Sequence, residues 1–355
     1  MPTAAHIEHY AKIVKENSIR RSLLNASAEI NEKVFDNKED FETLLDQVEQ
    51  KIFSISQVSR PQKFTHIKDD LPAAYERLEK LHRGEGALRG LATGFKQLDD
   101  TLSGLQRSEM IIIGARPSFG KTAFALDIAR QVANDKKSVG IFSLEMSSDQ
   151  VIDRMISAQA NIPLWRLRTG RLSGEVEFNL IQEAFDHLSK RHIFIDDTPS
   201  PNVMQLRSMA RRLQIEHGLD LLIIDYLQLI EPRSGFQSMV QQVTEISRAI
   251  KSLARELNIP VIAISQLSRA VDQREAKIPR LSDLRESGSL EQDADVVLLI
   301  YRKDRGNIVN NENEEGLVEM IIAKNRNGPL GSVKLKFNSE IVSFRSLDTK
   351  HVLDE

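Results

Sequence analysis

The sequence has no cysteine among its 355 residues and contains a single tryptophan. Without cysteine, the chain can form neither disulfides nor cysteine metal sites, and this absence suits a reducing cytoplasm. No apolar run approaches the roughly 18 residues that a membrane-spanning helix requires. The first residues also lack the charged-then-apolar pattern of a secretory signal. We therefore expect a soluble protein of the cytoplasm.

The chain also lacks an excess of positive charge. It carries 48 basic and 51 acidic residues, a formal net charge of −3. A nucleic acid would therefore have to be bound by local patches and not by a basic fold. The hydrophobic content of 41% is typical of a globular protein. The length allows two modest domains, or one core with appendages.

What the chain does contain is a glycine loop between an apolar strand and an amphipathic helix. The strand at 110–114 leads into a loop made of Ala115, Arg116, Pro117, Ser118, Phe119, Gly120, Lys121 and Thr122. In such a loop the backbone N–H groups and the new helix bind phosphates, the lysine reaches the β- and γ-phosphates, and the threonine binds Mg²⁺. The first motif position is alanine where the usual pattern has glycine, and a plain glycine turn is the alternative. We predict a nucleotide site.

The chain divides into three parts by pattern. Residues 1–58 are predicted to form a helical hairpin with a turn near Phe35, which packs against another hairpin or folds onto the main domain. Residues 59–90 are a linker whose short helix, at about 67–82, is either a docking element or part of a core. Residues 91–355 have an α/β pattern.

Within the α/β part, near-continuous apolar runs predict parallel strands that are buried on both faces. The last strands follow one another without helices, so we expect them to form an antiparallel edge. The predicted helices lie at about 147–160, 175–190, 202–217 and 239–257. The predicted strands are Met110–Gly114, Ser138–Ser143, His192–Asp196, Leu221–Asp225, Val261–Ser265, Val296–Tyr301, Leu317–Ala323 and Val333–Phe337.

Three polar residues stand at the carboxyl ends of predicted strands, where ligands bind in open α/β sheets. Asp225 would hold Mg²⁺, although it could instead be a turn or capping aspartate. Glu145 ends a strand that we expect beside the first, and is a candidate general base unless it only leads into the next helix. Gln266 could contact a γ-phosphate and transmit the presence of that phosphate to other parts of the protein.

Three further regions are candidates for contacts outside the phosphate loop. Lys324 and Arg326 end a predicted edge strand and could complete a neighbour's site, the alternative being a solvated strand end. The long segment 268–295, which we read as a loop, has a net negative charge. A polynucleotide would be bound there by a few groups, and a second loop, 231–237, offers Phe236 for stacking. The residues proposed for polynucleotide contact are Arg285, Glu286, Gly288 and Arg233.

Seven segments together resemble one family, the hexameric replicative DNA helicases of bacteria (the DnaB family), which have a RecA-like motor. The resemblance runs from about Ala4 to near the end of the chain, and it includes the alanine in the loop. The segments are GLATGFKQLD at 90–99, GARPSFGKT at 114–122, SLEMS at 143–147, LLIIDYLQL at 221–229, SQLSR at 265–269, SDLRESGSLEQDAD at 282–295 and IAKNRNGPLG at 322–331.

The resemblance implies a RecA-like P-loop domain with a mostly parallel sheet and antiparallel edge strands, preceded by a helical hairpin and a linker helix. It implies an ATP-dependent helicase that unwinds DNA as a homo-hexamer around one strand, with a helicase loader as partner. The implied roles are ATP and Mg²⁺ binding by Lys121 and Thr122, catalytic base for Glu145, Walker B acid for Asp225, γ-phosphate sensor for Gln266, trans-acting cations for Lys324 and Arg326, and DNA contact for Arg285, Glu286 and Gly288.

Family members begin with a globular helical domain, whereas this sequence starts at the hairpin, and we expect ring assembly to survive without that domain. Primase binding, which resembles a function of the amino-terminal collar, is left open. A recombination-type ATPase filament and a regulatory ATPase that does not bind DNA are the two alternatives.

Overall fold

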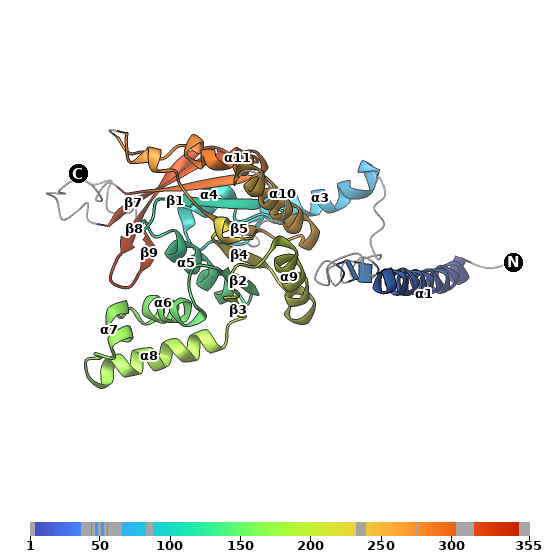
Figure 1. Ribbon diagram of the computed structural model, residues 1–355, viewed down its shortest axis with the longest axis horizontal. Helices are drawn as coiled ribbons and strands as arrows, with labels where there is room; N and C mark the ends of the chain where they lie inside the picture. Colours follow the sequence, from blue (N-terminus) through green and yellow to red (C-terminus); the bar gives the residue numbers. More distant parts are fainter. Residues whose placement is uncertain are drawn as a thin grey trace. The chain divides into compact units, whose positions relative to one another are not determined.

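A computed structural model describes residues 4–36, 66–82, 88–231, 239–274, 276–302 and 316–347, together with helical positions 44, 47, 48, 51, 52 and 55. The chain divides into two compact units, Met1–Arg83 with Met204–Met209, and Gly84–Val203 with Ala210–Glu355. Figure 1 labels the elements of each unit. None of the described helices is long and apolar enough to cross a membrane.

The second unit is built on a mixed sheet. In the described part of the chain this sheet has nine strands in the order β3-β2-β4-β5-β1-β6-β7-β8-β9. The first six in that order are parallel, and β7, β8 and β9 follow in antiparallel pairings. The strand bounds are Met110–Ala115 (β1), Val139–Ser143 (β2), Ile193–Asp196 (β3), Leu221–Asp225 (β4), Val261–Gln266 (β5), Val296–Arg302 (β6), Leu317–Asn325 (β7), Gly331–Asn338 (β8) and Ser343–Ser346 (β9).

The burial of the strands explains why the sequence indicates them. Every residue of β1, β2 and β4 is buried, as expected of parallel strands that are covered on both faces. β8 instead alternates between buried and exposed residues over its second half, because one of its faces is open to solvent. The predicted parallel sheet with an antiparallel edge is confirmed, whereas the four-residue strand β9 was not predicted.

Helices cover both faces of the sheet. Helix α5 (Lys121–Asn134) shares a core with Ile111 and Ile113 of β1. The alternate residues Met110 and Ile112 are also fully buried, so the opposite face is covered as well, and α10 (Met239–Leu257) contacts β1 and β5. The other helices of the α/β part are α4 (Lys96–Leu102), α6 (Ser148–Ala160), α7 (Leu164–Thr169), α8 (Gly174–Ser189), α9 (Val203–His217) and α11 (Gly288–Asp293).

The first unit contains the helices that the sequence predicts at the amino-terminal side. Helix α1 (Ala4–Asp36) has 33 residues, and α3 (Ile67–His82) is the predicted linker helix. Four large apolar side chains of α3 are exposed, namely Ile67, Leu71, Tyr75 and Leu78. The second hairpin helix, predicted at about 41–55, lies outside the described residues except for single helical positions.

A buried carboxylate ties the last strand to the helix of the glycine loop. Asp127 of α5 is 2% exposed. It accepts hydrogen bonds from the Phe344 backbone N–H (2.6 Å), the Ser343 hydroxyl (3.0 Å) and the Arg130 guanidinium (2.6 Å). Burial raises the pKa of Asp127, and the charge of Arg130 opposes that rise. Phe344 in turn packs edge-on against Phe124 of α5, so β9 is fixed to α5 by both polar and apolar contacts.

We expect Asp127→Ala to lower the free energy of unfolding by about 3–5 kcal/mol, because it leaves a buried arginine and a buried backbone N–H without their acceptor. Urea denaturation followed by circular dichroism measures the change. The matched control is Asp186→Ala, which removes an exposed partner of Lys190 on α8 and should cost less than about 1 kcal/mol. Equal losses in the two variants would contradict the anchoring role.

Candidate nucleotide and DNA sites

The loop between β1 and α5 has a shape that its residue types explain. Ala115 is the last residue of β1 and is fully buried, so the first motif position is part of the strand and does not require glycine. Gly120 precedes α5 with φ +94°, and a Cβ there would lie 2.9 Å from Cζ of Phe344. A side chain at position 120 would therefore be strained and would clash. The backbone of the loop is thus shaped by β1 at one end and by β9 at the other.

Lys121 lies at the centre of a charged cluster. Its side chain is 9% exposed, and its Nζ is 2.9 Å from Oε2 of Glu145 and 3.5 Å from Oδ1 of Asp225. The ammonium group also lies 4.2 Å from the centre of the Tyr226 ring, which adds a cation–π contact. A cation with this much burial needs such partners, and an incoming phosphate could take the place of one of them.

Asp225 and Thr122 place hard oxygen atoms beside this lysine. The Thr122 hydroxyl donates to Oδ2 of Asp225 at 2.6 Å, whereas the buried Oδ1 accepts no hydrogen bond. Burial raises the pKa of Asp225, and Lys121 and Thr122 oppose that rise. Among the described residues there is no group of three or more acidic, histidine or cysteine side chains that could hold a metal. Two oxygens together with phosphates are the arrangement in which Mg²⁺ is commonly bound.

Glu145 reaches this cluster by a route that the sequence analysis did not foresee. We expected its strand to lie beside β1, but β4 and β5 stand between β2 and β1, so that expectation is wrong. The ends of β2 and β4 are joined by the Leu144 N–H, which donates to the Asp225 carbonyl at 2.7 Å. Glu145 remains half-exposed, at 47%, and can contact both the lysine and solvent.

Gln266 ends β5 at the same edge of the sheet. It pairs in register with Ala115 of β1 and is exposed. The preceding Ser265 is buried, and its hydroxyl accepts a hydrogen bond from Gln228 at 3.0 Å. The strand order therefore brings Lys121, Glu145, Asp225 and Gln266 to one end of the parallel sheet.

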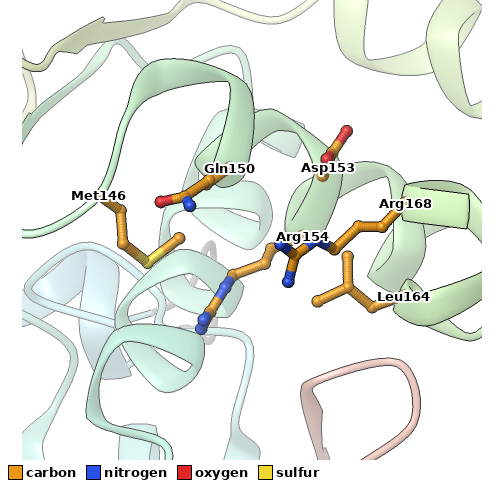
Figure 2. A pocket seen from close by; sticks show the side chains of 6 residues that line it. All are labelled: Met146, Gln150, Asp153, Arg154, Leu164 and Arg168. Carbon is orange, nitrogen blue, oxygen red and sulfur yellow. The ribbon is translucent and has the colours of Figure 1, made fainter.

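Arg154 is a residue of this site that the sequence reasoning missed. It lies on α6, and the charges of Asp225 and Glu145 act on it, although burial is the largest effect and lowers its pKa. Together with Arg168 of α7 it borders a cavity of about 70 Å³ (Figure 2), whose other lining residues are Met146, Gln150, Asp153 and Leu164. A single arginine on a helix has no local pattern that would have singled it out.

Lys324 and Arg326 lie at the opposite end of the sheet. Strand β7 is antiparallel to β6, with Asn325 opposite Val296, so the end of β7 meets the beginnings of the parallel strands. The strand is also not an edge strand as expected, because β8 and β9 continue the sheet beyond it. Since strands rise about 3.3 Å per residue, the length of β1 separates these cations from the glycine loop by about 17 Å.

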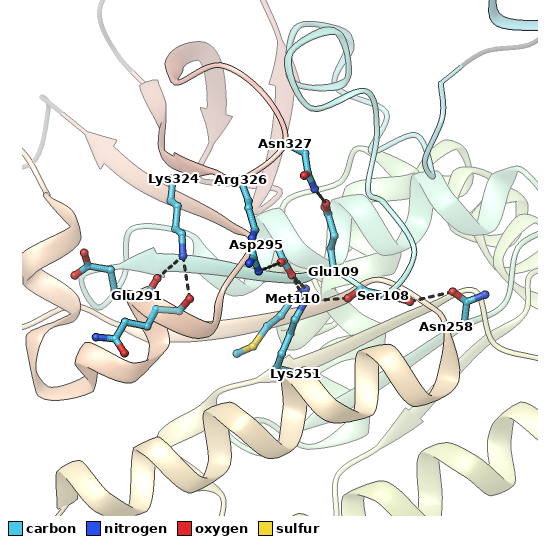
Figure 3. A network of polar contacts seen from close by, with 11 residues as sticks. Ser108, Glu109, Met110, Lys251, Asn258, Glu291, Asp295, Lys324, Arg326 and Asn327 are labelled. Carbon is cyan, nitrogen blue, oxygen red and sulfur yellow. Dashed lines mark hydrogen bonds and ion pairs between the residues drawn. The ribbon is translucent and has the colours of Figure 1, made fainter. Parts of the chain in front are cut away.

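A polar network fixes the segment that carries these two cations (Figure 3). Lys324 donates to the carbonyls of Glu291 (2.6 Å) and Gln292 (3.1 Å) at the end of α11, and burial lowers its pKa. Arg326 is 66% exposed and lies 3.5 Å from Oδ1 of the buried Asp295. Both cations are thus engaged within their own chain, but the Arg326 side chain remains largely accessible to solvent.

The candidate DNA-contacting segment is more regular than a loop. The described part of 268–295 contains η2 (Arg269–Val271), η3 (Leu281–Ser287) and α11. Arg285 and Glu286 belong to η3, and Gly288 begins α11. Gly288 is exposed, and a Cβ there would meet nothing within 4 Å, so a ligand could approach this backbone. Arg233 and Phe236 lie outside the described residues.

The first strand of the parallel sheet leads through a glycine loop into a helix, and carboxylates stand at the ends of neighbouring strands. This arrangement defines a P-loop nucleotide-hydrolysing protein of the RecA-like class. A family model, "DnaB-like helicase C terminal domain", matches residues 90–346. The chain belongs to this family of DnaB-like helicases.

Individual relatives agree with this membership. The chain is 46% identical to the replicative DNA helicase DnaB of Geobacillus stearothermophilus, over 99% of this chain and 77% of that protein. It is 39% identical to DnaB of Haemophilus influenzae, over 98% and 75%.

Solved structures are similar as well. A solved ATPase domain has a TM-score of 0.76 at 38% identity, over 81% of this chain and all of that one. A DnaB-like replicative helicase described with its interactions with primase has a TM-score of 0.79 at 33% identity, over 98% and 81%. The predicted family, the RecA-like fold and the classification as an ATP-hydrolysing helicase are confirmed.

The burial of Asp225 has a consequence for stability. A carboxyl whose pKa is raised on folding contributes stability that is fully present below its unfolded pKa and is lost as the pH rises through its folded pKa. Since burial outweighs Lys121 and Thr122 in setting this pKa, we expect the wild-type protein, without nucleotide, to gain stability relative to the Asp225→Asn protein as the pH falls from neutral toward about 4. The difference at neutral pH also contains the loss of one partner of the buried Lys121. Urea denaturation across this pH range tests the trend, and a difference that does not change with pH would contradict it.

Proposed function

We propose that the protein is an ATP-driven motor that moves along single-stranded DNA as a homo-hexameric ring and separates the duplex at the replication fork. The observation that carries this proposal is the position of the charged residues at opposite ends of the sheet. Lys121, Glu145 and Asp225 lie at one end of the parallel strands, and the exposed Arg326 lies at the other. This separation supports a site that Arg326 of one chain completes in the neighbouring chain.

At the nucleotide end, we propose that the loop from Ala115 to Thr122 holds ATP through its backbone N–H groups and the start of α5. Lys121, freed from Glu145, would neutralise the β- and γ-phosphates, and Thr122 and Asp225 would hold Mg²⁺, which supplies Lewis-acid chemistry when bound. Glu145 would then accept a proton from the attacking water, and its exposure leaves room for that water. Gln266 would contact the γ-phosphate.

At the opposite end, we propose that Arg326 enters the neighbour's site and stabilises the transferring phosphoryl group, with Lys324 beside it. Lys324 would first have to leave the carbonyls of α11. DNA contact is assigned to Arg285, Glu286 and Gly288, with Arg233 as a second element. The exposed start of α11 supports close approach to the DNA backbone.

The wider organisation is proposed on the same basis. Residues 1–58 form a hairpin domain, 59–90 a linker whose helix docks on a neighbour, and 91–355 the motor. The exposed apolar side chains of α3 support such docking. A helicase loader is the expected protein partner and the cytoplasm the expected location, whereas primase is not among the partners that we propose.

The trans arrangement can be tested by mixing inactive variants. We expect Arg326→Ala to lower the kcat of DNA-stimulated ATP hydrolysis by about 10³-fold or more, and Glu145→Ala to lower it by about 10²–10⁴-fold. An equimolar mixture should regain activity, because about a quarter of the interfaces in a randomly mixed ring then pair an intact arginine with an intact glutamate. The matched control mixes Arg326→Ala with the Glu145→Ala/Arg326→Ala double variant, in which no chain can donate the arginine. Recovery in the control, or none in the test mixture, would refute a trans-acting arginine.

If Lys121→Ala hydrolysed ATP at the normal rate, the nucleotide site itself would be misassigned.

The DNA contact can be tested by salt dependence. An arginine that neutralises one phosphate releases counterions, so Arg285→Ala should reduce the slope of log K against log salt by about 0.7 on single-stranded DNA. Fluorescence anisotropy with a labelled oligonucleotide measures K between low and physiological salt. Lys190→Ala, which removes an exposed cation directly after α8, should leave the slope unchanged. An unchanged slope for Arg285→Ala would remove this residue from the DNA-contacting set.

A further inference from the structure

The side chain of Arg116 turns away from the centre of the phosphate loop. Its Nη1 donates to the Leu267 carbonyl at 2.9 Å, and its Nε and Nη2 donate to Oδ2 of Asp272 at 3.0 and 2.6 Å. The arginine side chain is 14% exposed and the aspartate 51%. Exposed ion pairs usually contribute little, but a guanidinium held by a carboxylate and a carbonyl together has a defined geometry.

The residue that Arg116 holds follows the proposed phosphate sensor directly. Leu267 is 2% exposed, and its N–H donates to the Ala115 carbonyl at 3.1 Å. Its backbone is therefore bonded to the phosphate loop through both its N–H and its carbonyl. Because Gln266 immediately precedes Leu267, its backbone position is tied to that of the phosphate loop.

The next residue connects the same point to the DNA-contacting segment. The Ser268 N–H donates to the Asp283 carbonyl at 3.0 Å. The Asp283 side chain, 2% exposed, accepts from the Arg280 N–H at 2.7 Å and from Arg274 at 2.8 Å. These bonds fix the beginning of η3, which contains Arg285 and Glu286. Two hydrogen bonds, joined by the peptide bond between residues 267 and 268, thus connect the phosphate loop to η3.

Asp272 takes part in this connection through a single side-chain partner. Asp272 follows η2 directly and lies in sequence between β5 and η3. Within the described part of the chain its carboxylate bonds only to Arg116. It does not contact the Lys121 cluster. Its loss should therefore loosen the link between the two sites while leaving the nucleotide cluster intact.

We propose that the Arg116–Asp272 pair is a positioning device that couples the phosphate loop to the DNA-contacting segment, so that DNA at η3 and ATP at the loop sense each other through it. This inference rests on the proposed function, because it presupposes a DNA-stimulated ATPase. Arg116 fixes the backbone just after β5 through the Leu267 carbonyl. Asp272 holds the Arg116 guanidinium in the orientation that makes this hydrogen bond.

The test compares ATP hydrolysis with and without single-stranded DNA for wild type and Asp272→Asn. Without DNA, we expect the variant to keep its kcat and KM within about twofold of wild type. The ratio of stimulated to unstimulated kcat should fall about fivefold or more, the scale of a typical coupling between sites. Asp186→Asn, which neutralises the exposed aspartate of the Lys190 pair, is the matched control and should keep the wild-type ratio.

A double-mutant cycle separates coupling from a purely structural effect. Arg116→Met, and Arg116→Met combined with Asp272→Asn, should show the same reduced stimulation ratio, because either change removes the same link. Two independent, multiplicative losses would overturn the proposal. So would a normal stimulation ratio in Asp272→Asn, or equal losses of its stimulated and unstimulated rates. Absence of DNA stimulation in the wild type would instead refute the proposed function, which distinguishes the two failures.

Discussion

The ammonium group of Lys121, held between the carboxylates of Glu145 and Asp225, is the interaction on which the nucleotide end of the molecule depends. A cation that is almost fully buried has to be compensated, and its two partners come from the ends of different strands. Only a sheet that brings the ends of β2 and β4 close to the start of α5 can supply both. The order β2-β4-β5-β1 does so, with β3 beyond β2 on one side and β6 to β9 beyond β1 on the other.

The strands could be predicted because burial on both faces imposes a pattern on a short stretch of sequence. β1, β4 and β5 are apolar almost throughout, and they appear within one residue of their predicted bounds. The four residues of β9 carry no such pattern, since Phe344 is their only large apolar side chain. The order of strands is not a local property either, which is why Glu145 was expected beside β1 although two strands lie between them.

The candidate site divides in the same way. The loop from Ala115 to Thr122 is contiguous, so its residues could be recognised together, and its shape is as expected. The surroundings come from elsewhere in the chain: Arg154 projects from α6, and Asp272 reaches Arg116 across more than 150 positions of sequence. An arginine or aspartate at such a position looks like any solvated residue until the fold is known. The reversed direction of β7 was predicted, but its interior position depends on β8 and β9.

The reversal of β7 also determines how the number of complete nucleotide sites in a ring depends on whether the ring is closed. If the loop of one chain is completed by Arg326 of the next, working sites belong to contacts between chains, not to chains. A closed ring then has one site for each member, whereas a ring opened at one contact has one site fewer, and that missing site lies at the gap. The loss of ATP hydrolysis at one contact would then indicate that this contact is open. The two chains beside the opening would differ from the others in activity although all chains have the same sequence.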